Sequence, residues 1–310
     1  MNGLARVDVA LATYSGLPDL DPDDAALLPA LASRGLRAAA VRWDDERFDW
    51  SRVRACVIRS TWDYHERRDE FVAWAERAGA ATRLFNDAAT VRWNTHKGYL
   101  RELEARGVSI VPTTWVAAGE RADLGALLAA RGWDDAVIKP AVSANARDTI
   151  RVRGPRDLAR AQAHLDAIVS RAAGAGGDAM LQPYFASVET YGERSLVFFD
   201  GEFSHAIRKH PQLPLAASAV TSVGTGGTGG TGGEPPAEAE DAEVRFALDV
   251  LAAAARDTLY ARVDIARSEA GALALMELEL TEPSLFLAKS TGACAVDRFA
   301  AAIAARLARI

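Results

Sequence analysis

The sequence predicts a chain of mixed class, with a doubly wound α/β domain at the N-terminus and α+β lobes after it. Apolar strand patterns alternate with a helical pattern over residues 7–59, as they do in doubly wound sheets. Beyond residue 190, two pairs of strand patterns are each joined by a short turn signal, which is typical of antiparallel hairpins. The chain has 310 residues, of which 49% are hydrophobic, enough for two or three lobes.

In the N-terminal part, residues 7–13 predict a buried strand and residues 23–34 an amphipathic helix that ends at Gly35. Residues 36–41 and 55–59 predict the second and third strands. Ligands of such sheets lie beyond the carboxyl ends of the strands. The residues at these ends are therefore candidates for a substrate site: Thr13, Ser60, Thr61, Trp62 and Asp63. A second interpretation, in which Trp62 and Tyr64 are ordinary core aromatics, stays open.

Two lysines follow in the middle of the chain. Lys97 is expected just inside a helix that Asn94 or Thr95 caps and Gly107 closes. Lys139 comes near the end of the apolar run 136–140, so its side chain is expected to emerge where a strand stops. Each lysine taken singly is equally compatible with a solvated surface position.

The segments around Lys139 favour a nucleotide site over the solvated alternative. Pro140 breaks the strand, and the small residues 141–146 form a loop that can approach phosphate groups closely. The apolar run 180–185 then offers backbone groups that could hydrogen-bond an adenine edge. The order of these features along the chain is what a nucleotide site requires.

The C-terminal part begins with a predicted hairpin, in which residues 195–199 and 202–208 flank the turn Asp200-Gly201. Residues 221–233 are rich in glycine and threonine and are either a slack linker or a lid. A phosphate-binding P-loop is excluded there, because no Gly-Lys-Ser/Thr follows. Helices are expected over residues 238–258 and 297–309.

Three carboxylates near the C-terminus carry the most information. Residues 260–267 and 275–280 predict strands joined by a turn at residues 269–271, which would bring Asp264 opposite Glu277. Alternation along the second strand places Glu277 and Glu279 on one face, with Met276 and Leu278 on the other. Three converging carboxylates repel one another unless a cation neutralises them, and Mg²⁺ prefers oxygen ligands. A sheet face that simply meets water is the alternative interpretation.

Composition limits the class of protein further. The net charge is −6 and no basic tract is visible, which argues against nucleic acid as the main partner. No apolar run has the length of a membrane span, and the N-terminus lacks the apolar core of a signal peptide. Cys56 and Cys294 are the two cysteines, and Cys56 is expected to be buried packing. The sequence thus predicts an enzyme of the reducing cytoplasm that engages no membrane.

Several of these motifs, in this order, resemble those of ATP-grasp ligases of the glutathione-synthetase type. A narrower resemblance is to the ligase group that closes the cycloserine ring, and it extends from about residue 7 onward. The residues that carry the resemblance are Lys97 and the segments 58–64, 93–100, 137–140, 181–184, 192–201, 262–264 and 276–285.

The resemblance implies an ATP-grasp fold preceded by a doubly wound (pre-ATP-grasp) domain. It places an N-terminal substrate domain in residues 1–94 and a small ATP-grasp lobe in residues 95–178. The C-terminal lobe in residues 179–310 would hold the metal site and a flexible loop over residues 211–237.

The resemblance also implies roles for single residues. Lys97 and Lys139 would hold ATP phosphates, and Arg208 or Lys209 would face the transferred phosphate. Asp264, Glu277 and Glu279 would bind Mg²⁺, and the remaining nucleotide contacts would come from Gln182, Pro183, Tyr184 and Glu193.

The sequence departs from the family pattern at three points. Glu279 stands where many relatives have asparagine, and Arg194 stands where the narrower group leads us to expect an aromatic residue. No arginine or lysine lies between Lys209 and Arg245, although relatives usually place an arginine in a covering loop there.

The expected activity is ATP- and Mg²⁺-dependent C–N ligation through an acyl phosphate. The substrates would be a small carboxylate and an amine, and closure of a ring within one molecule is one form of this reaction. Two alternatives stay open: a small-molecule kinase of the same fold, and a non-catalytic ATP-binding regulatory protein. A homodimer also stays open as the assembly.

Overall fold

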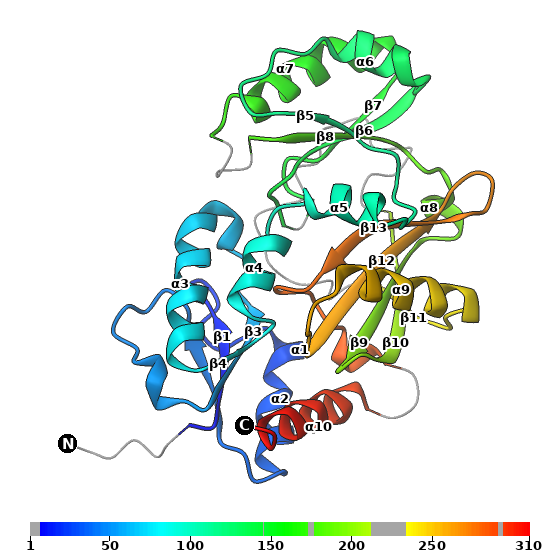
Figure 1. Cartoon of the computed structure of the whole chain (residues 1–310). Coiled ribbons are helices and arrows are strands. Elements are labelled where there is room, and N and C mark those ends of the chain that lie inside the picture. The colour runs from blue at the N-terminus through cyan, green and yellow to red at the C-terminus, as the bar shows by residue number, and fades with distance from the viewer. Residues whose placement is uncertain (1–6, 145, 173–176, 212–233, 291–293) are drawn as a thin grey trace.

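The computed structural model describes residues 7–144, 146–172, 177–211, 234–290 and 294–310. Figure 1 shows three sheets, one in each part of the chain. The N-terminal sheet is parallel, in the order β2-β1-β3-β4. Its strands are β1 (Val9–Thr13), β2 (Ala38–Arg42), β3 (Ala55–Ser60) and β4 (Arg83–Phe85). The parallel order with short helices between strands confirms the doubly wound domain expected from the alternating pattern.

The helices of this domain differ from expectation at one place. The helix expected over residues 23–34 is two helices, α1 (Pro22–Ala25) and α2 (Leu27–Ala32), that meet at Ala26. Pro29 explains the break, because its ring would clash with the carbonyl group four residues earlier in one continuous helix. The other regular segments here are η1 (Trp50–Arg52), η2 (Tyr64–Glu66), α3 (Arg68–Ala81) and α4 (Ala88–Asn94).

The middle part forms an antiparallel sheet in the order β5-β8-β6-β7. Its strands are β5 (Thr114–Val116), β6 (Asp135–Pro140), β7 (Ile150–Arg153) and β8 (Ala179–Pro183). Helices α6 (Leu124–Arg131) and α7 (Leu158–Val169) cover one face of this sheet (Figure 1), and η3 (Pro155–Asp157) leads into α7. As predicted, Lys139 lies near the end of a strand. The apolar run 180–185 lies largely in β8.

The C-terminal part holds a sheet in the order β11-β10-β9-β12-β13. Its neighbouring strands are antiparallel: β9 (Glu193–Phe199), β10 (Glu202–Lys209), β11 (Pro236–Ala237), β12 (Tyr260–Arg267) and β13 (Leu273–Glu279). Around it lie α5 (Tyr99–Ala105), α8 (Ser187–Thr190), α9 (Asp241–Ala254), η5 (Leu287–Lys289) and α10 (Ala295–Leu307). Both predicted hairpins are confirmed, and positive φ angles at Asp200 and Gly201 make the first turn.

The glycine-rich residues 221–233 fall within 212–233, outside the described residues, so the choice between linker and lid stays a prediction. The expected loop over residues 211–237 does include one paired segment at its end, because β11 hydrogen-bonds to β10. The proposed division of the chain at residues 94 and 178 likewise stays a prediction.

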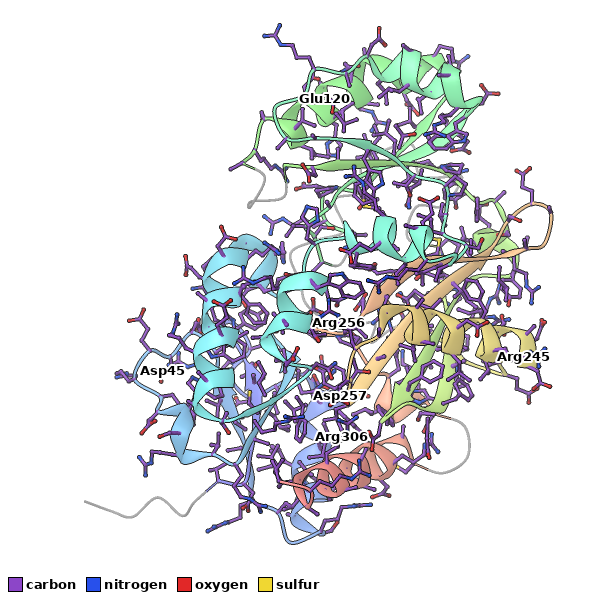
Figure 2. All side chains as sticks on the ribbon, viewed as in Figure 1. Asp45, Glu120, Arg245, Arg256, Asp257 and Arg306 are labelled. Carbon is purple, nitrogen blue, oxygen red and sulfur yellow. The ribbon has the colours of Figure 1, made fainter. Side chains whose placement is uncertain are left out.

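The N-terminal and C-terminal sheets share one apolar core. Val9 and Val57 of the N-terminal sheet belong to the same buried cluster as Phe199 and Tyr260 of the C-terminal sheet. Phe299 of α10 belongs to this cluster too. Arg306 anchors the far end of α10, since it pairs with Asp257 and Asp200 at 2.6 Å each, and Figure 2 shows Arg306 close to Asp257. This shared core holds the N-terminal domain against the C-terminal sheet, which carries Asp264, Glu277 and Glu279.

Asn86 is a polar link between these two parts. Its buried side-chain amide donates to the carbonyl groups of Tyr260 and Leu280 at 2.8 and 2.7 Å and accepts from the Leu259 amide at 2.7 Å. The residue has a φ of 56°, a left-handed conformation that asparagine tolerates better than alanine does.

We expect Asn86→Ala to lower the free energy of unfolding by about 3 kcal/mol, since it loses these bonds and adds backbone strain. Urea unfolding followed by far-UV circular dichroism measures the change. Asn86→Gly loses the same bonds but adds no backbone strain, so its loss in the free energy of unfolding should be about 1 kcal/mol smaller than that of Asn86→Ala. A loss below about 1 kcal/mol for Asn86→Ala would show that the link is not important to stability.

Candidate functional site

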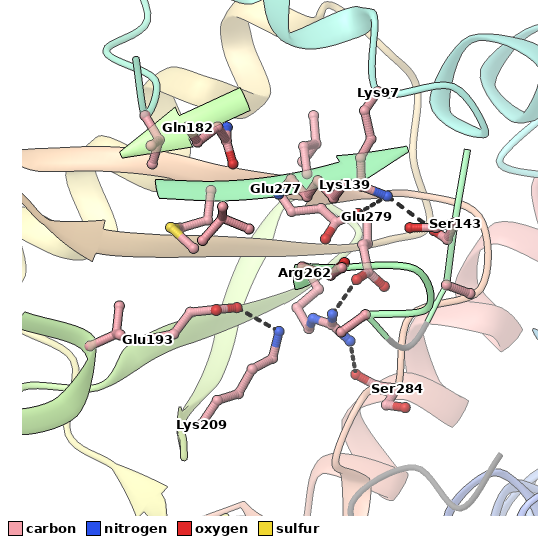
Figure 3. A pocket seen from close by; sticks show the side chains of 18 of the residues that line it. Lys97, Lys139, Ser143, Gln182, Glu193, Lys209, Arg262, Glu277, Glu279 and Ser284 are labelled. Atoms are coloured by element: carbon pink, nitrogen blue, oxygen red, sulfur yellow. Dashed lines mark hydrogen bonds and ion pairs between the residues drawn. The ribbon is translucent and has the colours of Figure 1, made fainter. Parts of the chain in front are cut away.

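A cavity of about 480 Å³ lies between the middle sheet and the C-terminal sheet, and it reaches the N-terminal domain at Trp62 and Tyr64. The side chains that line it come from all three parts of the chain. They include Lys97, Val137, Lys139, Ser143, Gln182, Tyr184, Glu193, Lys209, Arg262, Met276, Glu277, Glu279, Glu282, Ser284 and Phe286. Figure 3 shows several of these side chains pointing toward one another.

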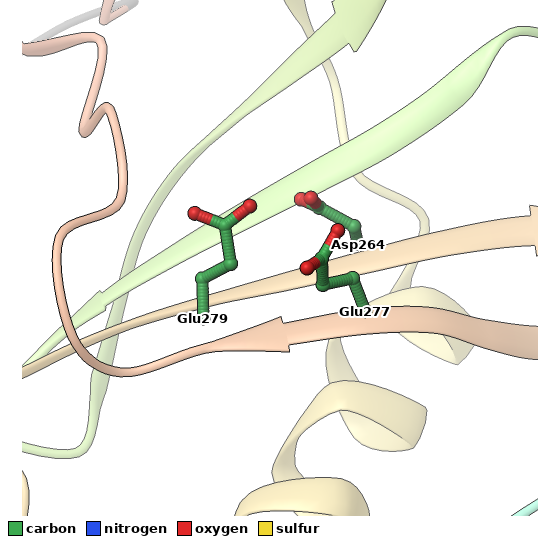
Figure 4. A group of neighbouring side chains, drawn as sticks. All are labelled: Asp264, Glu277 and Glu279. Atoms are coloured by element: carbon green, nitrogen blue, oxygen red, sulfur yellow. The ribbon is translucent and has the colours of Figure 1, made fainter. Parts of the chain in front are cut away.

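The three predicted carboxylates converge. Asp264 on β12 pairs directly with Glu277 on β13, and one carboxylate oxygen from each of Asp264, Glu277 and Glu279 lies within 4.8 Å of the others (Figure 4). All donors are hard oxygens, the kind that Mg²⁺ prefers. The alternative of a sheet face that merely meets water is wrong, because Asp264 is fully buried and both glutamates line the cavity.

One detail of this strand differs from expectation. The register of β12 and β13 shifts beyond Asp264, which pairs with Glu277, while Ile265 pairs with Leu275. Met276 is therefore the extra residue of a β-bulge, and it lines the cavity outside the buried cluster to which Leu278 belongs. A bulge places two neighbouring side chains against one partner, so strict alternation fails there.

Each carboxylate of the triad already has a basic partner. Lys97 contacts Glu277 at 2.7 Å, Lys209 contacts Asp264 at 2.6 Å, and Arg262 contacts Asp264 at 2.9 Å and also Glu279. Burial by itself would raise the pKa of Asp264, but Arg262 and Lys209 outweigh it and hold that pKa well below its usual range. The charge of the cluster is thus balanced by side chains that can also meet phosphate.

Of the three carboxylates, Glu279 has the negative charge that neighbouring cations compensate least. Burial raises its pKa to about 8, and repulsion from Glu277 and Asp264 adds to the effect against the single guanidinium of Arg262. A divalent cation among the three carboxylates would remove this repulsion. The all-oxygen donor set and the mutual repulsion of its carboxylates therefore fit a magnesium ion.

Lys97 lies between two helices and not inside one as expected. Asp87 caps α4, Asn94 ends it, and α5 begins only at Tyr99. The Asn94 side chain bonds the Leu278 carbonyl and the Leu280 amide, so it is committed to β13. The ammonium group of Lys97 contacts Glu277 and donates to the Ser143 carbonyl at 3.0 Å.

Lys139 differs from the other lysines and arginines of the cavity wall. No hydrogen bond or ion pair of its ammonium group occurs among the residues that the structure describes, whereas Lys97, Lys209 and Arg262 each have carboxylate partners. Burial lowers the pKa of Lys139, and the attraction of Glu277 offsets this only in part. An uncompensated, half-buried cation in a cavity is a site for an anion.

The strand β8 and the residues after it line the cavity as expected. Gln182 donates to the Thr113 hydroxyl at 2.9 Å, and the Tyr184 hydroxyl donates to Glu189 at 2.9 Å. The Tyr184 amide already donates to the Asp135 carbonyl at 2.9 Å, so it is not free for a nucleobase. Pro183 and Tyr184 supply mainly apolar wall here.

Arg208 and Lys209 lie on opposite faces of β10. Lys209 lines the cavity and bonds both Glu193 at 2.7 Å and Asp264 at 2.6 Å. Arg208 is absent from the cavity wall and donates to the carbonyl groups of residues 190 and 191. Gly192 allows this, because a Cβ there would come within 2.7 Å of Arg208. Of the two alternatives, the geometry therefore favours Lys209.

Of the five predicted substrate residues, one lines the cavity and four do not. Trp62 lines the cavity, but Thr13, Ser60, Thr61 and Asp63 do not. The Thr13 hydroxyl donates to the Leu17 carbonyl at 2.5 Å, and the Ser60 hydroxyl donates to Asp24 at 2.7 Å. Asp63 accepts from Trp43 and Arg67 at 2.9 and 2.7 Å, while the buried Thr61 hydroxyl has no partner within the described structure.

Several cavity residues were not singled out from the sequence: Tyr64 as a wall residue, Arg262, Glu282, Ser284 and Phe286. Arg262 and Glu282 lie in segments that carry the family resemblance, which was the one available signal. Their role depends on which side chains the fold brings beside them.

Known proteins resemble this chain in sequence and in structure. A family model described as the N-terminal domain of D-cycloserine synthetase DcsG matches residues 9–86. The cycloserine biosynthesis protein DcsG of Streptomyces lavendulae is 37% identical to this chain, over 96% of the chain and 98% of that protein. The chain belongs to the DcsG family. Members of this family are ATP-grasp ligases, so the chain is an ATP-dependent ligase.

Solved structures confirm the expected fold. The crystal structure of D-cycloserine synthetase DcsG has a TM-score of 0.83 at 33% identity, covering 96% of this chain and 99% of that one. D-alanine–D-alanine ligase from Bacillus anthracis complexed with ATP has a TM-score of 0.65 at 15% identity, covering 98% of each chain. The second likeness shows the ATP-grasp fold alone. Among the described helices of this family member, none has the length and apolar character needed to cross a bilayer.

Proposed function

We propose that this chain is an ADP-forming C–N ligase that activates a small amino-acid carboxylate as an acyl phosphate. One observation carries the proposal: an unpaired, half-buried lysine, Lys139, lines the same cavity as Glu277 and Glu279, two of the three converging carboxylates. Lysine recognises phosphate, and the triad would hold Mg²⁺, which would neutralise phosphate charge during transfer. Known ATP-bound relatives of the same fold support ATP as the phosphate donor.

In the first step, a carboxylate oxygen of the substrate attacks the γ-phosphorus of ATP, and the bond to the β-phosphate oxygen breaks to release ADP. Lys97 and Lys139 would bind the phosphates, and Lys209 would meet the phosphoryl group in transfer. In the second step, an amine nitrogen attacks the acyl carbon, loses a proton, and phosphate leaves. This chemistry needs alignment and charge neutralisation and no protein nucleophile.

The name of the 37%-identical relative supports ring closure within one substrate molecule. We therefore extend the proposal to an intramolecular ligase. Arg194 lies outside the cavity wall and packs on the Tyr191 ring, so its departure from the expected aromatic residue does not alter the wall directly.

The test is ADP release over a panel of amino acids and dipeptides, with mass spectrometry of the products. A ring-forming ligase yields the mass of one substrate less one water, and an intermolecular ligase yields two substrates less one water. A product that carries a phosphoryl group would instead support the kinase alternative. No ADP release with any carboxylate at saturating Mg²⁺ would contradict the proposal.

A further inference from the structure

Ser195 places a buried hydroxyl in a part of β9 that is otherwise apolar. Residues 196–199, which follow it on the strand, are all buried and apolar, and Ser195 itself is fully buried. A hydroxyl in such surroundings costs free energy unless it forms a hydrogen bond. The Ser195 hydroxyl donates to Oδ1 of Asp264 at 2.7 Å. The serine therefore contacts one of the three carboxylates assigned to Mg²⁺.

The pairing of the strands explains this contact. Strands β9 and β12 are antiparallel neighbours, and Ser195 lies directly opposite Asp264 in their register. On the other side of β12, Asp264 lies opposite Glu277 of β13. Opposite residues have their side chains on the same face of a sheet, so these three form a row across three strands. Glu193 shares this face and lines the cavity, whereas Ser195 is absent from the cavity wall.

The two carboxylate oxygens of Asp264 have different partners. Oδ2 accepts from the Lys209 ammonium group at 2.6 Å and from Arg262 at 2.9 Å, and both of these side chains line the cavity. Oδ1 accepts from Ser195 and from Nε of Arg262 at 2.9 Å. Lysine and arginine in a cavity wall can exchange a carboxylate for a phosphate, because both anions accept charge-assisted hydrogen bonds. The serine lies outside the wall and stays bonded to Oδ1 when they do.

We propose that Ser195 is a positioning residue of the metal site, whose hydroxyl holds Oδ1 of Asp264 so that Oδ2 is the oxygen left for Mg²⁺. The proposal rests on the proposed function, which assigns Mg²⁺ to the triad. Hydrogen-bond partners of a ligating carboxylate fix its orientation, and their loss lowers metal affinity by about 10- to 100-fold. Without the hydroxyl, Asp264 keeps its charge but loses the bond that fixes the orientation of its carboxylate.

The test is a calorimetric titration of Ser195→Ala with a non-hydrolysable ATP analogue, once in excess Mg²⁺ and once with a chelator. The dissociation constant without metal, divided by that with metal, measures how strongly the bound metal and the nucleotide are coupled. We expect this ratio to fall by about 10-fold or more relative to wild type, while the dissociation constant without metal stays within about twofold. Ser195→Thr, which keeps a hydroxyl, should recover most of the loss.

Ser60→Ala is the matched control. Ser60 is also fully buried, and its hydroxyl donates to the buried Asp24 at 2.7 Å. Asp24 pairs with a buried arginine at 2.9 Å, as Asp264 does, but neither Ser60 nor Asp24 lines the cavity. The two substitutions remove the same kind of bond, so both should lower the midpoint of urea unfolding. Only Ser195→Ala should change the ratio of dissociation constants.

An unchanged ratio in Ser195→Ala, or an equal fall in Ser60→Ala, would overturn the positioning role while leaving the ligase and its metal site intact. If Mg²⁺ does not strengthen binding of the analogue to wild type, the metal assignment of the proposed function is wrong, and this inference falls with it. If Ser195→Ala does not fold, Ser195→Cys decides, because it keeps a side chain of similar shape with only a weak donor. A wild-type ratio in Ser195→Cys would then contradict the proposal.

Discussion

Glu277→Gln should lower ATP-dependent turnover by about 1,000-fold or more. The substitution keeps the shape of the side chain but removes a charge that faces the cavity and contacts Lys97 at 2.7 Å. It would weaken the magnesium site and misalign a lysine assigned to phosphate at the same time. Asp264→Asn should have a similar effect, because Asp264 contacts both Lys209 and Arg262.

A binding measurement with and without Mg²⁺ isolates the contribution of the metal. Calorimetric titration with a non-hydrolysable ATP analogue, with and without Mg²⁺, should show that Mg²⁺ strengthens binding to wild type and not to Glu277→Gln. Glu240→Gln is a suitable control, since Glu240 pairs with Arg267 outside the cavity wall. Normal turnover of both triad variants at ordinary Mg²⁺ would contradict the site assignment.

Lys139→Met should weaken ATP binding by about 100-fold and leave adenosine binding nearly unchanged, because the lysine meets phosphate charge and not the base. The same substitution should raise the stability of the ligand-free protein by about 1 kcal/mol. The sign follows from the lowered pKa: a lysine whose folded pKa lies below its unfolded value opposes folding at neutral pH, where the unfolded chain binds the proton more readily.

Lys97→Met provides the matched comparison. It should also weaken ATP binding, but it leaves the half-buried Glu277 without its partner and should lower stability by about 3 kcal/mol. Urea unfolding without ligand gives both values. A loss of stability in Lys139→Met, together with equal weakening of ATP and adenosine, would show that Lys139 is structural.

The parts of the site that local patterns determine were predictable from sequence. The hairpin that brings Asp264 opposite Glu277 follows from two short strand patterns and a turn, all within 21 residues of one another. Lys139 near a strand end follows from Pro140. These features depend on residues close in the chain, where periodicity and turn chemistry are informative.

Other features depend on tertiary contacts or on competing local signals. Asn94 looks like a helix cap, but it serves β13, nearly 200 residues later. Pro29 interrupts a helix within a pattern that is otherwise amphipathic. Arg208 and Lys209 must face opposite sides of a strand, but only the register with β9 shows which one faces the cavity. Whether Lys139 has a partner cannot be known until the whole cavity is assembled.

The central claim is that a substrate carboxylate is activated by phosphorylation before the C–N bond forms. Its most direct test uses the best substrate from the panel with ¹⁸O in both carboxylate positions, and mass spectrometry of the released phosphate. An acyl phosphate predicts one ¹⁸O atom in each phosphate, because the attacking carboxylate oxygen leaves with phosphorus when the nitrogen displaces it. Unlabelled phosphate, released at the same rate as ADP, would contradict the account.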